Sequence, residues 1–225
     1  MTKIFIATPA YAGTVTVSYA VSLAETKSML DANNIGNILR ISTSNALLVF
    51  ARNQLIEGFM GSDCTHMLCL DADIGWPPSS VMSLINHDEE FVAGVYPSRK
   101  PDVFNFRPMF KEDKSLVYSE KKLVQMEYIP AGFMLLKRSA IEKMRRKFPE
   151  LFVVPKSPDK SSFMGYCLFN TEVWDGQFWG EDYVFCHRAR EAGVEIWVDP
   201  FIEFYHAGQK GTLAQTFTTE KQKSI

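Results

Sequence analysis

The alternation of apolar runs with helix-like segments in the first hundred residues most constrains the fold of this chain. Strands are predicted over residues 4–8, 37–41, 67–70 and 91–95, and helices over residues 17–32, 46–60 and 77–86. Four strands separated by helices predict a parallel, doubly wound α/β sheet, because a parallel connection needs a crossover that a helix supplies. The first helix is expected to turn Val21, Ala24 and Met29 toward the core.

The second half of the chain has a less regular pattern. Strands are predicted over residues 103–110, 123–129, 132–136 and 194–198, and helices over residues 139–148 and 180–192. Residues 149–163 contain three prolines and are expected to form a surface loop, and the polar residues 218–225 are expected to fray. No shift in composition marks a linker, so residues 1–225 are predicted to form one domain, which could be part of a longer protein.

Charge and composition argue against several classes of protein. The formal net charge is −2, and no basic run is long enough to indicate nucleic-acid binding. No apolar stretch approaches the ~20 residues of a membrane-spanning helix, and no signal segment opens the chain. The four cysteines form no CxxC pair and are expected to be free thiols. We therefore expect a soluble, cytoplasmic protein, unless a further domain anchors it.

Acidic residues follow the third predicted strand. Ligands bind beyond the carboxyl ends of the strands in such sheets, which directs attention to residues 8–11, 71–73 and 96–100. Asp71 and Asp73 lie two residues apart on extended chain, so both carboxylates can face one cation. A hard divalent ion held by one or two carboxylates keeps positions open for diphosphate oxygens. The alternative is a pair of loop aspartates, one of which caps the next helix.

A second acidic pair, Glu181 and Asp182, follows Gly180 at the start of a predicted helix. The helix dipole favours acidic side chains there by about 0.3–1 kcal/mol each, so a purely structural role is the first alternative. The functional interpretation is that one carboxylate accepts a proton from an acceptor hydroxyl. The dipole is expected to keep that carboxylate ionised and to weaken it as a base.

Together these motifs resemble those of the GT-A glycosyltransferases, particularly the broad family that includes chitin, cellulose and hyaluronan synthases. The resemblance spans residues 4–206, and compact versions of this kind occur in bacteria, phages and large DNA viruses. Its pieces are Thr8-Pro9-Ala10-Tyr11, Ala51-Arg52-Asn53, Asp71-Ala72-Asp73, Trp179-Gly180-Glu181-Asp182 and the stretch from Phe185 to Gly193. The family implies a GT-A, Rossmann-like, mostly parallel sheet flanked by helices. Residues 1–100 would then be the nucleotide-binding half and residues 101–217 the acceptor-binding half.

The resemblance also implies roles for individual residues. The donor, a UDP-sugar by family analogy, would be contacted by Thr8, Pro9, Ala10, Tyr11, Arg52, Asp71, Ala72 and Asp73. Lys210 lies four residues after His206 and is a candidate for a phosphate contact, with simple solvation as the alternative. Tyr11 would stack on the base, and Arg52 would lie near the diphosphate or the base. Asp73 would be the more direct metal ligand, with Asp71 toward the ribose or a coordinated water. Asp182 would be the general base and Glu181 would contact the acceptor sugar, which implies inversion at the anomeric carbon.

His206 follows the last predicted strand and is a candidate third metal ligand with Asp71 and Asp73, although a lone histidine is more often structural. An imidazole ligand favours Mn²⁺ over Mg²⁺. Trp179 is open to two interpretations, a stacking platform for a sugar or core packing. Gly132 is either a simple turn or a point of close approach for a sugar. The basic residues Arg99, Lys100 and Arg107 are candidates for phosphate contacts or for simple solvation.

The expected partners are a nucleotide-sugar donor and a glycan or other hydroxyl acceptor, with no nucleic acid and no transmembrane segment. For a viral chain the compartment would be the host cytoplasm. One alternative is a nucleotide-sugar-binding domain without turnover, which has no need of the acidic pair at residues 181–182. The other is a nucleotidyltransferase. Such an enzyme would carry a Gly-rich, basic loop after the first strand, whereas residues 8–13 hold one glycine and no Arg or Lys.

Overall fold

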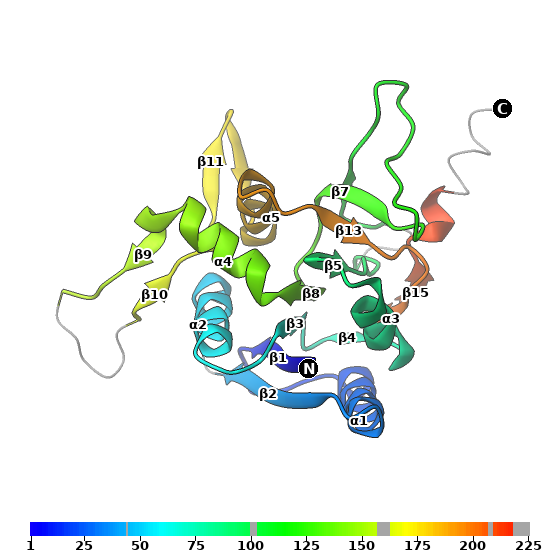
Figure 1. Cartoon of the computed structure of the whole chain (residues 1–225), viewed down its shortest axis with the longest axis horizontal. Helices are drawn as coiled ribbons and strands as arrows, with labels where there is room; N and C mark the ends of the chain where they lie inside the picture. Colours follow the sequence, from blue (N-terminus) through cyan, green and yellow to red (C-terminus); the bar gives the residue numbers. More distant parts are fainter. Residues whose placement is uncertain (44, 100–102, 157–162, 207–208, 218–225) are drawn as a thin grey trace.

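The computed structural model describes residues 1–43, 45–99, 103–156, 163–206 and 209–217. Within them, a central eight-stranded sheet has the order β2-β1-β3-β8-β5-β13-β7-β6 (Figure 1). Its strands are β1 (Lys3–Ala10), β2 (Gly36–Thr43), β3 (His66–Leu70), β5 (Phe91–Ala93), β6 (Arg107–Pro108), β7 (Val124–Tyr128), β8 (Phe133–Lys137) and β13 (Ile196–Val198). Strands from the two halves of the chain interleave at the centre of this sheet, where β8 lies between β3 and β5.

Six of these strands run in one direction, and β7 and β8 run in the other. The mostly parallel α/β sheet expected from the sequence is therefore confirmed. The four first-half strands do not all lie side by side, however. β8 enters between β3 and β5 and pairs antiparallel with both. The apolar run of residues 132–136 explains this position, because a strand buried on both faces can occupy the centre of a sheet.

Helices cover both faces of the sheet (Figure 1). α2 (Leu48–Met60), α4 (Arg138–Lys147) and α5 (Glu181–Glu191) lie on one face, and α1 (Val17–Ala32) and α3 (Ser79–His87) lie on the other. The strands supply alternate side chains to the two cores: Phe5 and Ala7 face the α2 side, whereas Ile4 and Ile6 face the α1 side. The predicted helices are all present, and their ends agree with the expected ends within two residues.

The predicted apolar face of α1 is wrong. Val21 is 50% exposed, and the residues that α1 buries are Tyr19, Ser22, Thr26 and Leu30. The two polar residues are buried because they satisfy one tryptophan. The backbone N–H of Trp76 donates to Ser22 Oγ at 2.9 Å, and its indole N–H donates to Thr26 Oγ1 at 2.9 Å. The hydrogen bonds of Ser22 and Thr26, together with the core side chains of Tyr19 and Leu30, therefore define the buried face of this helix.

The second half departs most from the expected elements. The strand predicted over residues 103–110 is reduced to β6, with isolated bridges at Phe104 and Phe110. Pro108 lies within that segment and has no backbone N–H to donate to a ladder. The expected loop of residues 149–163 begins with a 3-10 turn (Pro149–Leu151) and a short strand, β9. Strands that the pattern did not predict are β4 (Ile74–Gly75), β9 (Phe152–Val153), β10 (Gly165–Tyr166), β11 (Glu172–Trp174), β12 (Gln177–Trp179), β14 (Glu203–His206) and β15 (Gln209–Thr212).

Two sequence-based expectations about the surface and the thiols can be compared with the structure. Within the described residues, no helix is long and apolar enough to cross a membrane. All four cysteines are free, as predicted, and Cys64, Cys69 and Cys186 are buried. The tail of residues 218–225, which was expected to fray, lies outside the described residues.

Candidate functional site

Asp71 and Asp73 follow β3 at its carboxyl end, the position that the strand pattern predicted. The chain then enters β4, which pairs antiparallel with β14, so that Ile74 lies opposite His206. This pairing brings the late histidine beside the early aspartates, although 133 residues separate His206 from Asp73 in the sequence. Three predicted site residues therefore meet at one edge of the sheet.

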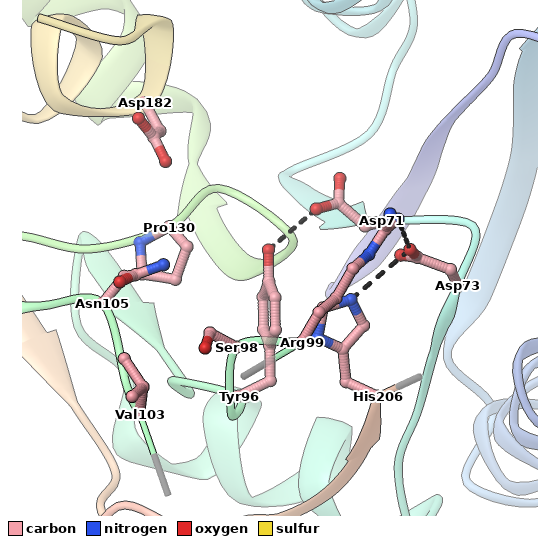
Figure 2. Close-up of a pocket in the computed structure, with 10 residues that line it drawn as sticks. All are labelled: Asp71, Asp73, Tyr96, Ser98, Arg99, Val103, Asn105, Pro130, Asp182 and His206. Carbon is pink, nitrogen blue, oxygen red and sulfur yellow. Dashed lines mark hydrogen bonds and ion pairs between the residues drawn. The ribbon is translucent and has the colours of Figure 1, made fainter. Parts of the chain in front are cut away.

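Asp73 faces two basic groups (Figure 2). Its Oδ2 atom lies 2.7 Å from the guanidinium of Arg99 and 3.4 Å from Nε2 of His206. The other ring nitrogen of His206, Nδ1, lies 2.7 Å from the carbonyl oxygen of Pro97. A carbonyl can only accept, so Nδ1 carries the proton of that bond and Nε2 is the atom presented to Asp73. This is the arrangement in which a second interaction orients a metal-binding imidazole.

Asp71 is held more tightly than Asp73. Its Oδ1 accepts from Arg52 at 2.8 Å, and its Oδ2 accepts from the hydroxyl of Tyr96 at 2.8 Å (Figure 2). Burial raises the pKa of Tyr96 well above its usual value, and the Asp71 carboxylate raises it further, so the phenol stays protonated and donates. A Cβ at Gly132 would lie 2.3 Å from Asp71 Oδ2 and 2.4 Å from the Tyr96 hydroxyl. Gly132 thus permits a close approach between two protein side chains.

Arg52 was expected near a bound diphosphate or base, but its side chain is only 5% exposed. Besides Asp71, it faces Glu181, whose Oε1 lies 3.5 Å from its Nε atom. The guanidinium also lies 5.5 Å from the centroid of the Phe169 ring. The structure therefore places Arg52 behind the acidic residues rather than on the surface that a ligand would touch.

Glu181 and Asp182 begin α5, with Gly180 as the N-cap. Burial first, and the neighbouring Glu181 second, raise the pKa of Asp182 from 3.8 to about 6, although a backbone N–H and Arg52 act in the opposite direction. The expectation that the helix N-terminus keeps this carboxyl a weak base is therefore wrong. Desolvation of the charged form outweighs the dipole and the N–H of Tyr183, which donates to Asp182 Oδ1 at 2.8 Å.

Two adjoining cavities lie along these residues. The larger, of about 560 Å³, is drawn in Figure 2 and runs from Asp73 and His206 on one wall to Asp182 on the other. The smaller, of about 380 Å³, lies on the β1 side and is lined by Pro9, Ala10, Tyr11, Thr14, Val15, Thr16, Leu48, Asp71, Ala72 and Asp73. Asp71 and Asp73 line both cavities, so they form the wall between them.

The four residues at the end of β1 and just after it, residues 8–11, differ in whether they face the smaller cavity. Pro9, Ala10 and Tyr11 line the smaller cavity, and the Tyr11 side chain is 66% exposed at its edge. Thr8 was predicted to line the same pocket, but it is fully buried and its hydroxyl lies 2.5 Å from that of Tyr19. Thr8 therefore supports the fold beneath the cavity and does not face it.

Three other candidates, Lys210, Arg107 and Trp179, line neither of the two cavities. Lys210 pairs with Glu203 at 3.0 Å, Arg107 pairs with Glu127 at 2.8 Å, and neither lines the two cavities. Lys100 lies outside the described residues. The ring of Trp179 stacks on Trp174 at 5.0 Å and packs against Tyr128 at 5.4 Å. These contacts favour the packing interpretation of Trp179 over a free platform for a sugar.

The described side chains do not by themselves form a complete set of metal ligands. Within the parts of the chain that the structure describes, no group of three or more His, Cys, Asp or Glu side chains is arranged to hold a metal ion. Asp73 Oδ2 and His206 Nε2 lie 3.4 Å apart, and the same oxygen of Asp73 contacts Arg99. Asp71 turns its two oxygens toward Arg52 and Tyr96 instead.

No family model and no curated protein matches this chain. Among solved structures it is similar to GalNAc-T7 with UDP, GalNAc and Mn²⁺, at 9% identity and a TM-score of 0.47, over 92% of this chain and 44% of that one. It is also similar to a protein assigned as a glucose-1-phosphate thymidylyltransferase from Bacillus anthracis, in complex with a sucrose, at 14% identity and a TM-score of 0.34, over 64% of this chain and 74% of that one.

This chain thus spans less than half the length of the GalNAc-T7 chain. One similar structure is a glycosyltransferase and the other a nucleotidyltransferase. At such low identity the similarity concerns the fold alone and does not define the chemistry. The narrower resemblance to chitin, cellulose and hyaluronan synthases stays a prediction.

Several cavity residues received no role from the sequence. Tyr96, Asn105 and Pro130 line the larger cavity, and Thr14, Thr16 and Leu48 line the smaller one. Tyr96 lies in the segment after a parallel strand, where the carboxyl-end rule directs attention. Nothing in the local pattern distinguishes Asn105 or Pro130, because their position depends on how the second half folds over the first.

Proposed function

We propose that this chain is a metal-dependent glycosyltransferase, which moves a sugar from a nucleotide diphosphate sugar, with a UDP-sugar favoured, to an acceptor hydroxyl. The observation that carries the proposal is the shared wall of Asp71 and Asp73 between two cavities. A diphosphate bound at that wall would have its nucleoside on the side of Tyr11 and its sugar on the side of Asp182. A nucleotide sugar, with a nucleoside at one end and a sugar at the other, would fit the two cavities.

The metal would be held by Asp73 and His206, with Asp71 set behind them. A carboxylate oxygen and an imidazole nitrogen 3.4 Å apart are a suitable donor pair for a divalent ion, and the nitrogen favours Mn²⁺ over Mg²⁺. Positions beyond these two donors are available to diphosphate oxygens and water. When bound, the ion would offset the negative charge that develops on the departing nucleotide diphosphate. Arg99, which contacts the same oxygen of Asp73, would be free to turn toward the phosphates.

Asp182 would act as the general base. A carboxyl with a pKa of about 6 is largely ionised at neutral pH and is a stronger base than an ordinary aspartate. It faces the cavity from the wall opposite Asp73 (Figure 2), where an acceptor hydroxyl would approach from the side away from the leaving group. This geometry favours inversion at the anomeric carbon. Glu181 would contact the acceptor sugar.

The nucleoside would occupy the smaller cavity. Its described lining combines Tyr11, Pro9 and Leu48 with the hydroxyls of Thr14 and Thr16. An exposed tyrosine ring can stack on a base, and threonine hydroxyls can bond to a ribose or a base edge. These groups suit a nucleoside without selecting one base.

A nucleotide-sugar-binding domain without turnover is the second candidate. The arrangement of Asp71, Asp73 and His206 serves binding equally well. The raised pKa of Asp182 favours catalysis, because a proton acceptor needs it and a simple binder does not. A nucleotidyltransferase ranks lower, because residues 8–13, which form the end of β1 and the turn after it, contain no Arg or Lys.

The test is a panel of nucleotide sugars assayed for release of the nucleotide diphosphate with Mn²⁺, with Mg²⁺ and with a chelator. We expect release from one or more donors that requires the metal and is abolished in Asp73→Ala. Asp63→Ala is the matched control, because Asp63 is an exposed aspartate paired with Lys3 at the other end of the sheet. Full metal-dependent release by Asp73→Ala would refute the site. Binding of UDP and Mn²⁺ without release, with acceptors varied, would favour the domain without turnover.

A further inference from the structure

Arg52 forms ion pairs with one carboxylate of each acidic motif. It lies in the middle of α2, and its guanidinium contacts Asp71 at 2.8 Å and faces Glu181 at 3.5 Å. These two carboxylates come from the end of β3 and the start of α5, which are separated by more than a hundred residues of chain. A buried cation therefore stands between the two walls of the cavity.

Electrostatics keep Arg52 charged in this position. Burial by itself lowers the pKa of Arg52, but the carboxylates of Asp71 and Glu181 raise it by more. Burying an ion costs several kcal/mol unless partners compensate it, so the two carboxylates are needed where they are. The planar guanidinium can address two groups in different directions, which a lysine ammonium on a flexible stem cannot do in the same way.

The contact between Arg52 and Glu181 is longer than a hydrogen bond. Nε of Arg52 is buried without a hydrogen-bond partner, although Glu181 Oε1 lies 3.5 Å away. A movement of about 0.5 Å would bring the pair to ordinary hydrogen-bond distance. An unsatisfied buried donor is costly, so a closer approach of Glu181 is favoured whenever the start of α5 can shift. Glu181 is itself adjacent to Asp182, and any such shift moves the proposed base.

We propose that Arg52 is a positioning residue. It links Asp71, on one wall of the larger cavity, to Glu181, which directly precedes Asp182 on the opposite wall, and so sets the distance between a bound donor and Asp182. It acts through Asp71 and Glu181 and touches no substrate. The proposal rests on the proposed function for its kinetic consequence. The structural link between the two motifs is independent of that function and can be tested separately.

The kinetic test compares Arg52→Lys with Arg145→Lys. Arg145 is a matched control, because it also pairs with a glutamate, Glu57 at 2.5 Å, has a buried Nε without a partner, and lies away from both cavities. We expect Arg52→Lys to lower kcat on the order of 100-fold, the effect of a misplaced catalytic group, while the donor KM and Mn²⁺ affinity change little. Arg145→Lys should leave kcat unchanged. A rise in donor KM at constant kcat would overturn the proposal and make Arg52 a ligand contact.

The structural test needs no turnover. Stability to urea is measured for Arg52→Lys, Glu181→Gln and the double variant, together with Arg145→Lys and its combination with Glu181→Gln. We expect the first pair of changes to be non-additive and the second pair to be additive, because Arg52 faces Glu181 whereas Arg145 pairs with Glu57. Glu181 lies directly before Asp182 and its side chain is partly exposed, so Glu181→Gln provides a second variant if Arg52→Lys folds poorly. This variant should also lower kcat.

The two tests separate the possible failures. Additive losses for Arg52 and Glu181 would refute the link whether or not the chain has activity. Non-additive losses in a chain that cleaves no nucleotide sugar would leave the link intact and refute the proposed function. Equal effects of Arg52→Lys and Arg145→Lys on kcat would reduce Arg52 to a structural ion pair.

Discussion

The two acidic motifs of the cavity differ in how their charges are compensated. Asp71 and Asp73 meet Arg52, Tyr96, Arg99 and His206 within 3.4 Å. Asp182 has Glu181 beside it and accepts one backbone N–H, and it forms no ion pair within the described residues. Carboxylates surrounded by donors and cations are suited to hold a ligand in place. A carboxyl that is buried beside another acid is suited to exchange a proton near neutral pH.

Removal of the base should have the largest effect. Asp182→Asn keeps the shape of the side chain but cannot accept a proton, so we expect kcat to fall on the order of 10²–10⁴-fold. Affinity for UDP and Mn²⁺, measured by calorimetry, should change little because Asp73 and His206 lie on the other wall. A loss of metal affinity that matched the loss of kcat would break the division of roles between the two motifs.

His206→Gln should weaken the metal site. We expect Mn²⁺ affinity to fall about 10- to 100-fold, with a smaller loss for Mg²⁺, because the nitrogen donor is what favours the transition ion. The measurement is the titration of free Mn²⁺ by electron paramagnetic resonance, with Mg²⁺ as a competitor. His187→Gln is the control, since His187 packs against Trp174 at 5.3 Å and lines neither cavity. Unchanged Mn²⁺ affinity in His206→Gln would remove this residue from the site.

Gly132→Ala should disturb the contact between Asp71 and Tyr96 without changing any charge. The added methyl would overlap Asp71 Oδ2 and the Tyr96 hydroxyl, so we expect a loss of about 1–3 kcal/mol in the free energy of unfolding and weaker UDP binding. Gly61→Ala is the control, because Gly61 has αR backbone angles and its Cβ would make an ordinary contact at 3.4 Å. If both variants retained full stability in urea, the close contact among Gly132, Asp71 and Tyr96 would contribute little to the free energy of unfolding.

The raised pKa of Asp182 predicts a smaller effect, on stability. A carboxyl whose folded-state pKa lies near 6, above 3.8 when unfolded, binds its proton more tightly in the folded state. Its contribution to stability is present below about pH 4 and is lost as the pH rises through about 6. Asp182→Asn should therefore stabilise the chain at pH 8 by about 1–3 kcal/mol and have almost no effect at pH 4. The same ionisation predicts an acid limb near pH 6 in kcat/KM.

The pH measurements sharpen the comparison between the motifs. Urea titrations at pH 4 and pH 8 on the native chain and Asp182→Asn would measure the linkage directly. Asp113→Asn is a suitable control, because Ser115 donates to this exposed carboxyl and lowers its pKa, so its pH dependence should have the opposite sign. A stabilising effect of Asp182→Asn that was equal at the two pH values would show that ionisation of Asp182 is not its cause.

Local sequence patterns predicted most of the helices and strands in the first half of the molecule. The helix predicted over residues 17–32 has those bounds in the structure, and the strand before Asp71 ends where expected. These elements are set by periodicity and by turn residues within a short window, which sequence reasoning can see. The acidic pair at the start of α5 was identified for the same reason.

The tertiary structure decided everything that depends on distant residues. It placed β8 between β3 and β5, turned Ser22 and Thr26 of α1 inward for Trp76, and buried Arg52 between two carboxylates. It also decided the base strength of Asp182, because the helix N-terminus is a local feature whereas burial is not.

The sequence by itself thus determined the order along the chain of the helices and of the strands of the central sheet, and the presence of two acidic motifs at element ends. Only the folded chain brought His206 to Asp73, through the pairing of β4 with β14, and gave the two motifs different electrostatic surroundings. Backbone pairing and desolvation act between residues far apart in the chain, and no local pattern of side chains specifies their outcome.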